Sequence, residues 1–214
     1  MSKTERMAEV ARKLGETSFY QMPASANYHN NFSGGLLDHC TKVWLNLEKL
    51  TELLGLKWQD PSSPYIVAML HDACKIDAYF YNHDYKCWER KDEHPEGHGD
   101  LSLKVIEEMG IELTEEEKLC IRWHMGAFDE RENWSQFTNA IHKYPTVLWT
   151  HVADMMASHI DEVKTEEKTI CCLCNEPLMK GEVGNNPAPL RDKGVCCDHC
   201  NYHRVIPARL EGMK

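Results

Sequence analysis

The sequence has no apolar run long enough to cross a lipid bilayer, and it has no excess of basic residues. A membrane-spanning helix needs about 20 consecutive apolar residues, and no segment of this chain approaches that length. Lysine and arginine number 24 against 34 aspartate and glutamate residues, which gives a formal net charge of −10. We therefore expect no membrane partner. Binding of long nucleic acid is disfavoured, although a local basic groove can exist on an acidic protein.

Internal repeats, low-complexity segments and a secretory signal are also lacking. The residues after Met1 are polar and helix-like, so we expect a cytoplasmic protein. A chain of 214 residues can hold one domain of ordinary size and a small second one. Of the ten cysteines, six follow Ile170, and their Cys-x-x-Cys spacing favours zinc over disulfides. We expect the other four to be small buried apolar residues, namely Cys40, Cys74, Cys87 and Cys120.

Helical periodicity dominates the first three quarters of the chain. It predicts helices over 4–15, from 34 or 35 to 55, over 65–74, 100–109, 114–124 and 144–163, with a loop over 18–33. Thr114 with Glu117 three residues later is typical of a capping box. Aromatic residues around a polar centre at 79–88 are a weak signal for a small β-hairpin, and the sequence does not decide whether it forms. Composition changes between 163 and 169, so we predict an all-α helical domain over 1–165 and a small module over 166–214.

Histidine and aspartate residues recur inside the apolar faces of these predicted helices. His39 lies at helical spacing from apolar neighbours on both sides, which places its imidazole on the inward face. Asp154 lies in the same way on the last helix, and the pair His71 and Asp72 follows a short apolar run. Buried imidazole and carboxylate groups are costly unless something binds them, and together they suit a divalent transition metal.

Two motifs, GGLLDH at 34–39 and MLHDACK at 69–75, resemble the HD-domain superfamily of metal-dependent phosphohydrolases. The resemblance covers about residues 25 to 160 and implies a helical bundle. It implies one metal ion bound by His39, His71, Asp72 and Asp154. It also implies a second ion, whose additional ligands are His98 and His124. The implied ions are one or two of Mn, Fe, Co, Ni or Zn. Asp72 would bridge them, and a metal-bound hydroxide would be the nucleophile.

The same resemblance implies substrate-binding residues. Lys75, three residues after Asp72, would contact the substrate phosphate and offset developing negative charge. His29, ten residues before His39, would bind substrate or donate a proton to the leaving oxygen. Arg122 is a further candidate phosphate ligand, although on a helix it would point away from His124. Partners that orient the metal ligands could come from Asp77, His94, Asp100, His142, His151 and His159.

The cysteine-rich module has two Cys-x-x-Cys-Asn motifs separated by a loop with glycine and proline. This pattern predicts one structural zinc on Cys171, Cys174, Cys197 and Cys200, with Cys172, Cys196 and His199 as alternatives in a shifted register. The asparagine after each pair, Asn175 or Asn201, tolerates the left-handed backbone that such a turn often needs. So short a segment with little apolar core folds only if metal binding stabilises it. The module resembles zinc ribbons and treble clefs, whose role here stays open.

The leading hypothesis from the sequence is therefore a phosphohydrolase that acts on a nucleotide or phosphodiester. Absence of the Gly-Tyr-Pro extension makes a cyclic-dinucleotide substrate less favoured. Two alternatives stay open. One is a mixed-valent diiron oxygenase, because myo-inositol oxygenase uses the same ligand pattern on an HD fold. The other is a zinc-stabilised nucleic-acid or protein adaptor without catalysis. Substrate identity, native metal and oligomeric state are left open.

Overall fold

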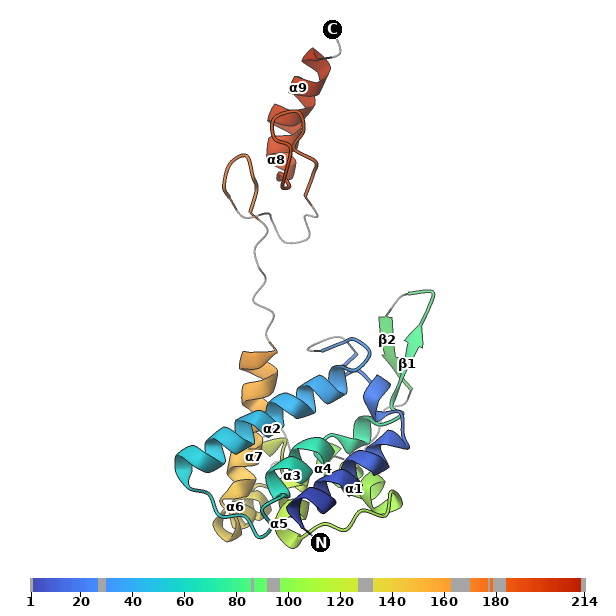
Figure 1. Ribbon diagram of the computed structural model, residues 1–214, viewed down its shortest axis with the longest axis vertical. Helices are drawn as coiled ribbons and strands as arrows, with labels where there is room; N and C mark the ends of the chain where they lie inside the picture. The colour runs from blue at the N-terminus through green and yellow to red at the C-terminus, as the bar shows by residue number, and fades with distance from the viewer. Residues whose placement is uncertain are drawn as a thin grey trace. The chain divides into compact units, whose positions relative to one another are not determined.

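The computed structural model divides the chain into two compact units, Met1–Val163 and Lys164–Lys214 (Figure 1). We describe each unit by itself. The structure describes residues 2–26, 30–85, 87–91, 97–126, 133–162, 170–176, 178 and 184–212.

The first unit is mostly helical, as the periodicity predicts. Its helices are α1 (Lys3–Gly15), α2 (Gly35–Leu54), α3 (Ser63–Leu70), α4 (His98–Glu108), α5 (Glu115–Arg122), α6 (Trp134–Lys143) and α7 (Thr146–Met156). The long helix α2 packs against α3 and α7, and α5 packs against α4 and α7 (Figure 1). This packing brings one face of α2, the end of α3 and one face of α7 together.

Helix ends follow local signals. Helix α2 begins after Gly34 at φ 86° and ends at Gly55 at φ 63°, left-handed conformations that glycine adopts without strain. The predicted capping box of α5 is confirmed, because Thr114 Oγ1 accepts from the N–H of Glu117 and the Glu117 carboxylate accepts from the N–H of Thr114. These boundaries agree with the sequence because caps depend on few neighbouring residues.

The hairpin left open by the sequence is present. Strands β1 (Tyr79–Asn82) and β2 (Cys87–Arg90) pair antiparallel, with Tyr79 opposite Arg90 and Asn82 opposite Cys87. The Asn82 side-chain oxygen accepts from the N–H groups of Asp84 and Tyr85 and so shapes the turn.

Several helix boundaries differ from the predictions, and one helix was not predicted. Helix α3 ends at Leu70 instead of near 74, because Asp72 leaves helical geometry (φ −104°, ψ 25°) and a tighter turn, η2 (Ala73–Lys75), follows. Helix α6 was missed, although Trp134, Phe137 and Ile141 stand at helical spacing. Helix α7 widens after Met156 into a π-helical segment, η5 (Ala157–Asp161).

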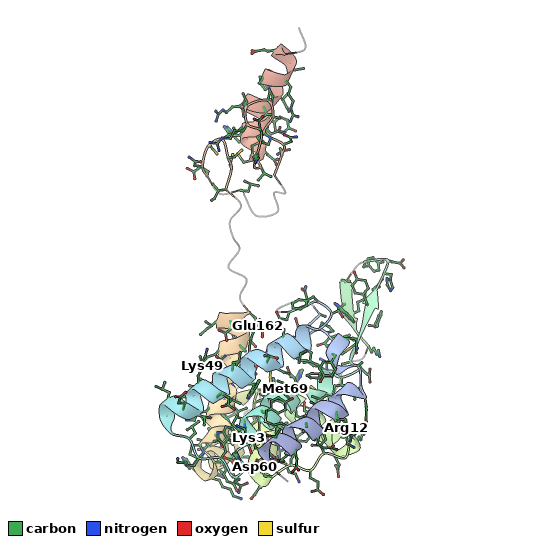
Figure 2. The ribbon with its side chains drawn as sticks, in the orientation of Figure 1. Lys3, Arg12, Lys49, Asp60, Met69 and Glu162 are labelled. Carbon is green, nitrogen blue, oxygen red and sulfur yellow. The ribbon has the colours of Figure 1, made fainter. Side chains whose placement is uncertain are left out.

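The core of this unit lies between α2, α3, α5 and α7. Its fully buried residues include Leu36, Val43, Leu47, Ile66, Leu70, Ile121 and Val147. In Figure 2, Met69 lies inside the unit, and the charged side chains of Lys3, Arg12 and Lys49 lie at its surface. Within the described residues, no helix combines the length and apolar character that a bilayer crossing requires.

The described residues of the second unit form little regular secondary structure. They include α8 (Asp198–Cys200), a π-helical segment η6 (Asn201–Val205) and α9 (Ile206–Glu211), and Asn185 forms a β-bridge with Cys196. Its buried apolar cluster consists of Cys171, Cys196, Cys200 and Val205. So small a core supplies little hydrophobic stabilisation, and three of its four members are cysteines.

Candidate metal centres

Three elements bring the first group of predicted ligands together. His39 comes from the inward face of α2, His71 and Asp72 follow α3, and Asp154 comes from α7. His39 Nε2 lies 3.1 Å from His71 Nε2 and 3.2 Å from Asp154 Oδ1, and Asp72 Oδ2 lies 3.4 Å from His71 Nε2. Donor atoms of His39, His71 and Asp72 all lie within 4.8 Å of one another, so these residues could hold a metal ion.

The hydrogen bonds of the two imidazoles show which ring nitrogen of each faces the site. His39 Nδ1 contacts Glu162 Oε1 at 2.8 Å, and His71 Nδ1 contacts the Ala68 carbonyl oxygen at 2.8 Å. A carboxylate and a carbonyl only accept, so each Nδ1 donates a proton to its partner and each Nε2 faces the other imidazole. Two Nε2 atoms 3.1 Å apart need a proton or a metal ion between them. Two nitrogens on one metal ion lie about 3.0–3.4 Å apart.

The charges in the site also favour a bound cation. Burial lowers the pKa of His39, but hydrogen bonds with Asp154 and Glu162 outweigh it and raise this pKa to about 9. Burial alone would raise the pKa of Asp72 and of Asp154. The Lys75 ammonium outweighs burial at Asp72 and holds the pKa of this carboxyl well below its usual range. The hydrogen bond from His39 has the same effect on the pKa of Asp154. The carboxylates stay ionised, and the cluster attracts positive charge.

Asp72 faces both sides of the site. Its Oδ2 atom lies toward His39 and His71, whereas its Oδ1 atom lies 3.6 Å from His124 Nε2. His124 Nδ1 contacts the Ile121 carbonyl oxygen at 2.7 Å, so Nδ1 carries a proton and Nε2 faces the Asp72 carboxylate. This Nε2 atom is buried and, within the described residues, has no hydrogen-bond partner. The donor set fits a cation on each side of Asp72.

Lys75 lies next to this carboxylate. The turn η2 places its Nζ atom 2.7 Å from Asp72 Oδ2, and only 12% of the side chain is exposed. Burial lowers the pKa of Lys75, but the charge of Asp72 outweighs burial and raises it. Lys75 therefore keeps a positive charge inside the site.

His98 begins α4 and lines the same cavity. Its Nδ1 atom lies 3.5 Å from the sulfur of Cys74. Donor atoms of Asp72, Cys74 and His98 all lie within 4.8 Å of one another and form a second group that could hold a metal ion. Sequence reasoning treated Cys74 only as a small buried residue.

A cavity of about 310 Å³ opens onto these residues. It is lined by His39, Asp72, Lys75, His98, His124, Met125, His151, Asp154, Met155, Ser158 and His159. His151 Nδ1 contacts the His124 carbonyl oxygen at 2.7 Å, so His151 holds the backbone of a predicted ligand. Five of the six predicted ligands thus line one cavity, and His71 lies behind them against His39.

Glu162 was missed by sequence reasoning. Its carboxylate lies after the π-helical segment η5, is 0% exposed and contacts His39 Nδ1 (labelled in Figure 2). No local pattern marks it, because its position depends on the wider turn of η5. A ligand imidazole oriented by a carboxylate is common in metal sites.

Other candidates lie elsewhere. Arg122 pairs with Asp100, at 3.1 Å between Arg122 Nε and Asp100 Oδ1, and its guanidinium lies 5.0 Å from the Trp123 ring centre. Asp77 and His142 are exposed. The candidates His29 and His94 lie outside the described residues.

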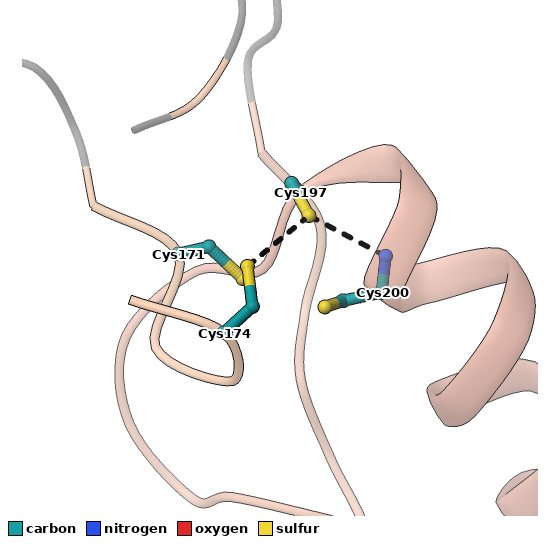
Figure 3. Close-up of side chains that lie close together, drawn as sticks. All are labelled: Cys171, Cys174, Cys197 and Cys200. Atoms are coloured by element: carbon teal, nitrogen blue, oxygen red, sulfur yellow. Dashed lines mark hydrogen bonds between the residues drawn. The ribbon is translucent and has the colours of Figure 1, made fainter. Parts of the chain in front are cut away.

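The cysteine module has a site of its own (Figure 3). The sulfur atoms of Cys171, Cys174, Cys197 and Cys200 all lie within 4.8 Å of one another, so they could hold a structural zinc. Cys174 and Cys197 sulfurs are 3.9 Å apart, and a tetrahedral four-thiolate zinc with Zn–S distances of about 2.3 Å separates its sulfurs by about 3.8 Å. The alternative ligands Cys172, Cys196 and His199 do not belong to this group of described residues.

Backbone N–H groups stabilise negative charge on this cluster. The Leu173 N–H points at the Cys171 sulfur (3.5 Å), and the Cys200 N–H points at the Cys197 sulfur (3.4 Å). Burial raises the pKa of Cys171, but backbone N–H groups, first that of Cys197, outweigh burial and lower it to about 6. Asn175 takes a left-handed backbone at φ 60° as the sequence allows, whereas Asn201 is right-handed because it continues the helix after Cys200.

Comparisons with protein-family models, curated proteins and solved structures find no match for this chain.

Proposed function

We propose that this protein is a metal-dependent phosphohydrolase of the HD type, acting on a nucleotide or another small phosphate ester. The proposal depends on one observation. Imidazole nitrogens and ionised carboxylates from separate helices converge around one cavity that also contains a buried, charged lysine. Burying so many ionisable groups together is costly, and a bound cation would compensate that cost.

In this proposal, His39, His71, Asp72 and Asp154 hold one divalent ion, and Asp72, His98 and His124 hold a second. Such ions lower the pKa of water toward neutrality and polarise a phosphoryl oxygen. Glu162 and the Ala68 carbonyl fix the His39 and His71 rings so that each presents Nε2 inward. The Asp72 carboxylate, with one oxygen on each side, lies where it can serve both ions.

Lys75 is proposed to bind the substrate phosphate. Its ammonium lines the cavity at the edge of the metal ligands, and its positive charge offsets charge that develops on phosphoryl oxygens. The cavity, about 310 Å³, lies at the lower end of the range for small-molecule pockets of roughly 300–1,000 Å³. Its size favours a small phosphorylated substrate over a long polymer.

The test is hydrolysis by the purified full-length protein loaded in turn with Mn, Fe, Co, Ni or Zn. The substrates are nucleoside mono-, di- and triphosphates, cyclic nucleotides and short oligonucleotides. We expect at least one to release phosphate or nucleotide. Asp72→Asn should lose turnover and the metal bound by the first unit. Lys75→Met should keep that metal, and its kcat should fall by about 10²–10³-fold.

Lys42→Met is the matched control, because Lys42 pairs with Asp38 on α2 and does not belong to the described cavity lining. Its activity should equal that of wild type. No turnover by any metal-loaded form, or full activity in Asp72→Asn, would refute the proposal. Bound iron with oxygen consumption would indicate the oxygenase, and salt-dependent nucleic-acid binding without turnover would indicate the adaptor.

A further inference from the structure

Cys74 is a buried cysteine whose sulfur faces polar side chains instead of the apolar core. Its side chain is buried, with 4% of the residue exposed, yet its sulfur faces the imidazole of His98 and the carboxylate of Asp72. The nearby Cys40, fully buried, belongs instead to the apolar core cluster. A thiol placed between an imidazole and a carboxylate is a potential metal ligand.

The distances fit coordination. A tetrahedral zinc with Zn–S of about 2.3 Å and Zn–N of about 2.0–2.1 Å separates sulfur from nitrogen by about 3.5–3.6 Å. The Cys74 sulfur and His98 Nδ1 are 3.5 Å apart. An S–H···N hydrogen bond has a similar length, so this distance alone does not decide. The carboxylate within reach of both atoms supplies the third donor of a metal site.

The backbone holds this geometry in place. The N–H of Cys74 donates to Ser102 Oγ at 3.1 Å, and Ser102 lies one helical turn after His98 on α4. The residue after His98 is Gly99, where a Cβ atom would lie 2.0 Å from the Arg122 carbonyl oxygen, so α4 packs directly on the backbone of α5. The turn η2 and the start of α4 are therefore locked together, with Cys74 and His98 facing each other.

A second, independent observation points to a cation here. His124 Nε2, buried and without a hydrogen-bond partner among the described residues, faces the Asp72 oxygen at 3.6 Å. His124 is not a member of the three-donor group, whereas Cys74 is. The arrangement differs in this respect from the ligand set that the sequence resemblance implies.

We propose that Cys74 is a direct ligand of the second metal ion, which Asp72 and His98 also hold. This inference rests on the proposed function for the presence of that ion. Binding converts the Cys74 thiol to a thiolate, forms a metal–sulfur bond and releases one proton to solvent. A thiolate in the ligand set selects a thiophilic ion such as zinc over magnesium or manganese.

The experiment uses the full-length protein loaded with cobalt, because thiolate ligands give cobalt a charge-transfer absorption in the near ultraviolet. The variants are Cys74→Ser and Cys74→Ala, and Cys87→Ser in strand β2 is the control. The four predicted zinc ligands of the second unit contribute equally to every spectrum and cancel in the difference. We expect Cys74→Ser to lose thiolate absorption and to bind one cobalt equivalent at least about tenfold more weakly, with Cys87→Ser unchanged.

Identical spectra for Cys74→Ser, Cys87→Ser and wild type, with metal beyond one equivalent bound, would overturn this inference and leave the proposed function standing. Binding of only one equivalent, in the second unit, would overturn both. Cadmium NMR of the wild-type protein needs no variant. It should show a signal with mixed sulfur, nitrogen and oxygen ligands separate from the four-thiolate signal, and its absence would also refute a Cys74 ligand.

Discussion

Replacement of Glu117 by alanine should destabilise the first unit strongly. The Glu117 side chain, 0% exposed, accepts four hydrogen bonds. The Arg6 guanidinium donates two of 2.6 Å, Ser63 Oγ donates one of 2.7 Å and the Thr114 N–H donates one of 2.8 Å. This carboxylate therefore joins α1, the start of α3 and the cap of α5.

The magnitude follows from what the substitution leaves behind. Removing one partner of a buried ion pair costs about 3–5 kcal/mol, because the other charge stays buried without compensation. Asp60 lies 3.7 Å from Arg6 and offsets part of that cost, so we expect about 3 kcal/mol. In a unit of this size, 1 kcal/mol shifts Tm by about 2–4 °C, so the expected fall is roughly 6–12 °C.

Tryptophan fluorescence during urea and thermal unfolding is a suitable assay, because all six tryptophans lie before residue 164 and report only on the first unit. Glu115→Ala is the matched control on the same helix. Glu115 pairs with Lys143 at the surface, where both side chains are more than half exposed, so its loss should lower the free energy of unfolding far less than the loss of Glu117. Equal losses of stability in Glu117→Ala and Glu115→Ala would refute the reasoning.

Three further predictions concern the metal sites. Glu162→Gln removes the charge that orients His39 and should weaken metal binding to the first unit about 10–100-fold, measured by competition with a chelating dye; an affinity equal to wild type would contradict this. Gly99→Ala forces a methyl group against the Arg122 carbonyl and should cost about 1–3 kcal/mol of unfolding free energy by urea titration. A strong zinc chelator should make residues 164–214 sensitive to protease while tryptophan emission of the first unit keeps its folded maximum; a resistant second unit would argue against a structural zinc.

Part of the candidate site follows from the sequence because the signals are local. Helical spacing alone places His39 and Asp154 on inward faces, and both side chains do point into the cluster. Likewise, the Cys-x-x-Cys spacing is enough to pair the ligands of the second unit. Lys75 was expected to contact a substrate phosphate, and the tighter turn η2 places it against the Asp72 carboxylate.

The amino-acid sequence by itself determined the helical character, the helix caps and the residue types that can bind metal, since each depends on neighbours within a turn or two. Only the tertiary structure decided which atoms face one another. Glu162 reaches His39 across 123 positions of the chain, and Cys74 meets His98 only because η2 packs on α4. Such contacts join segments far apart in sequence, and no local period or spacing encodes them.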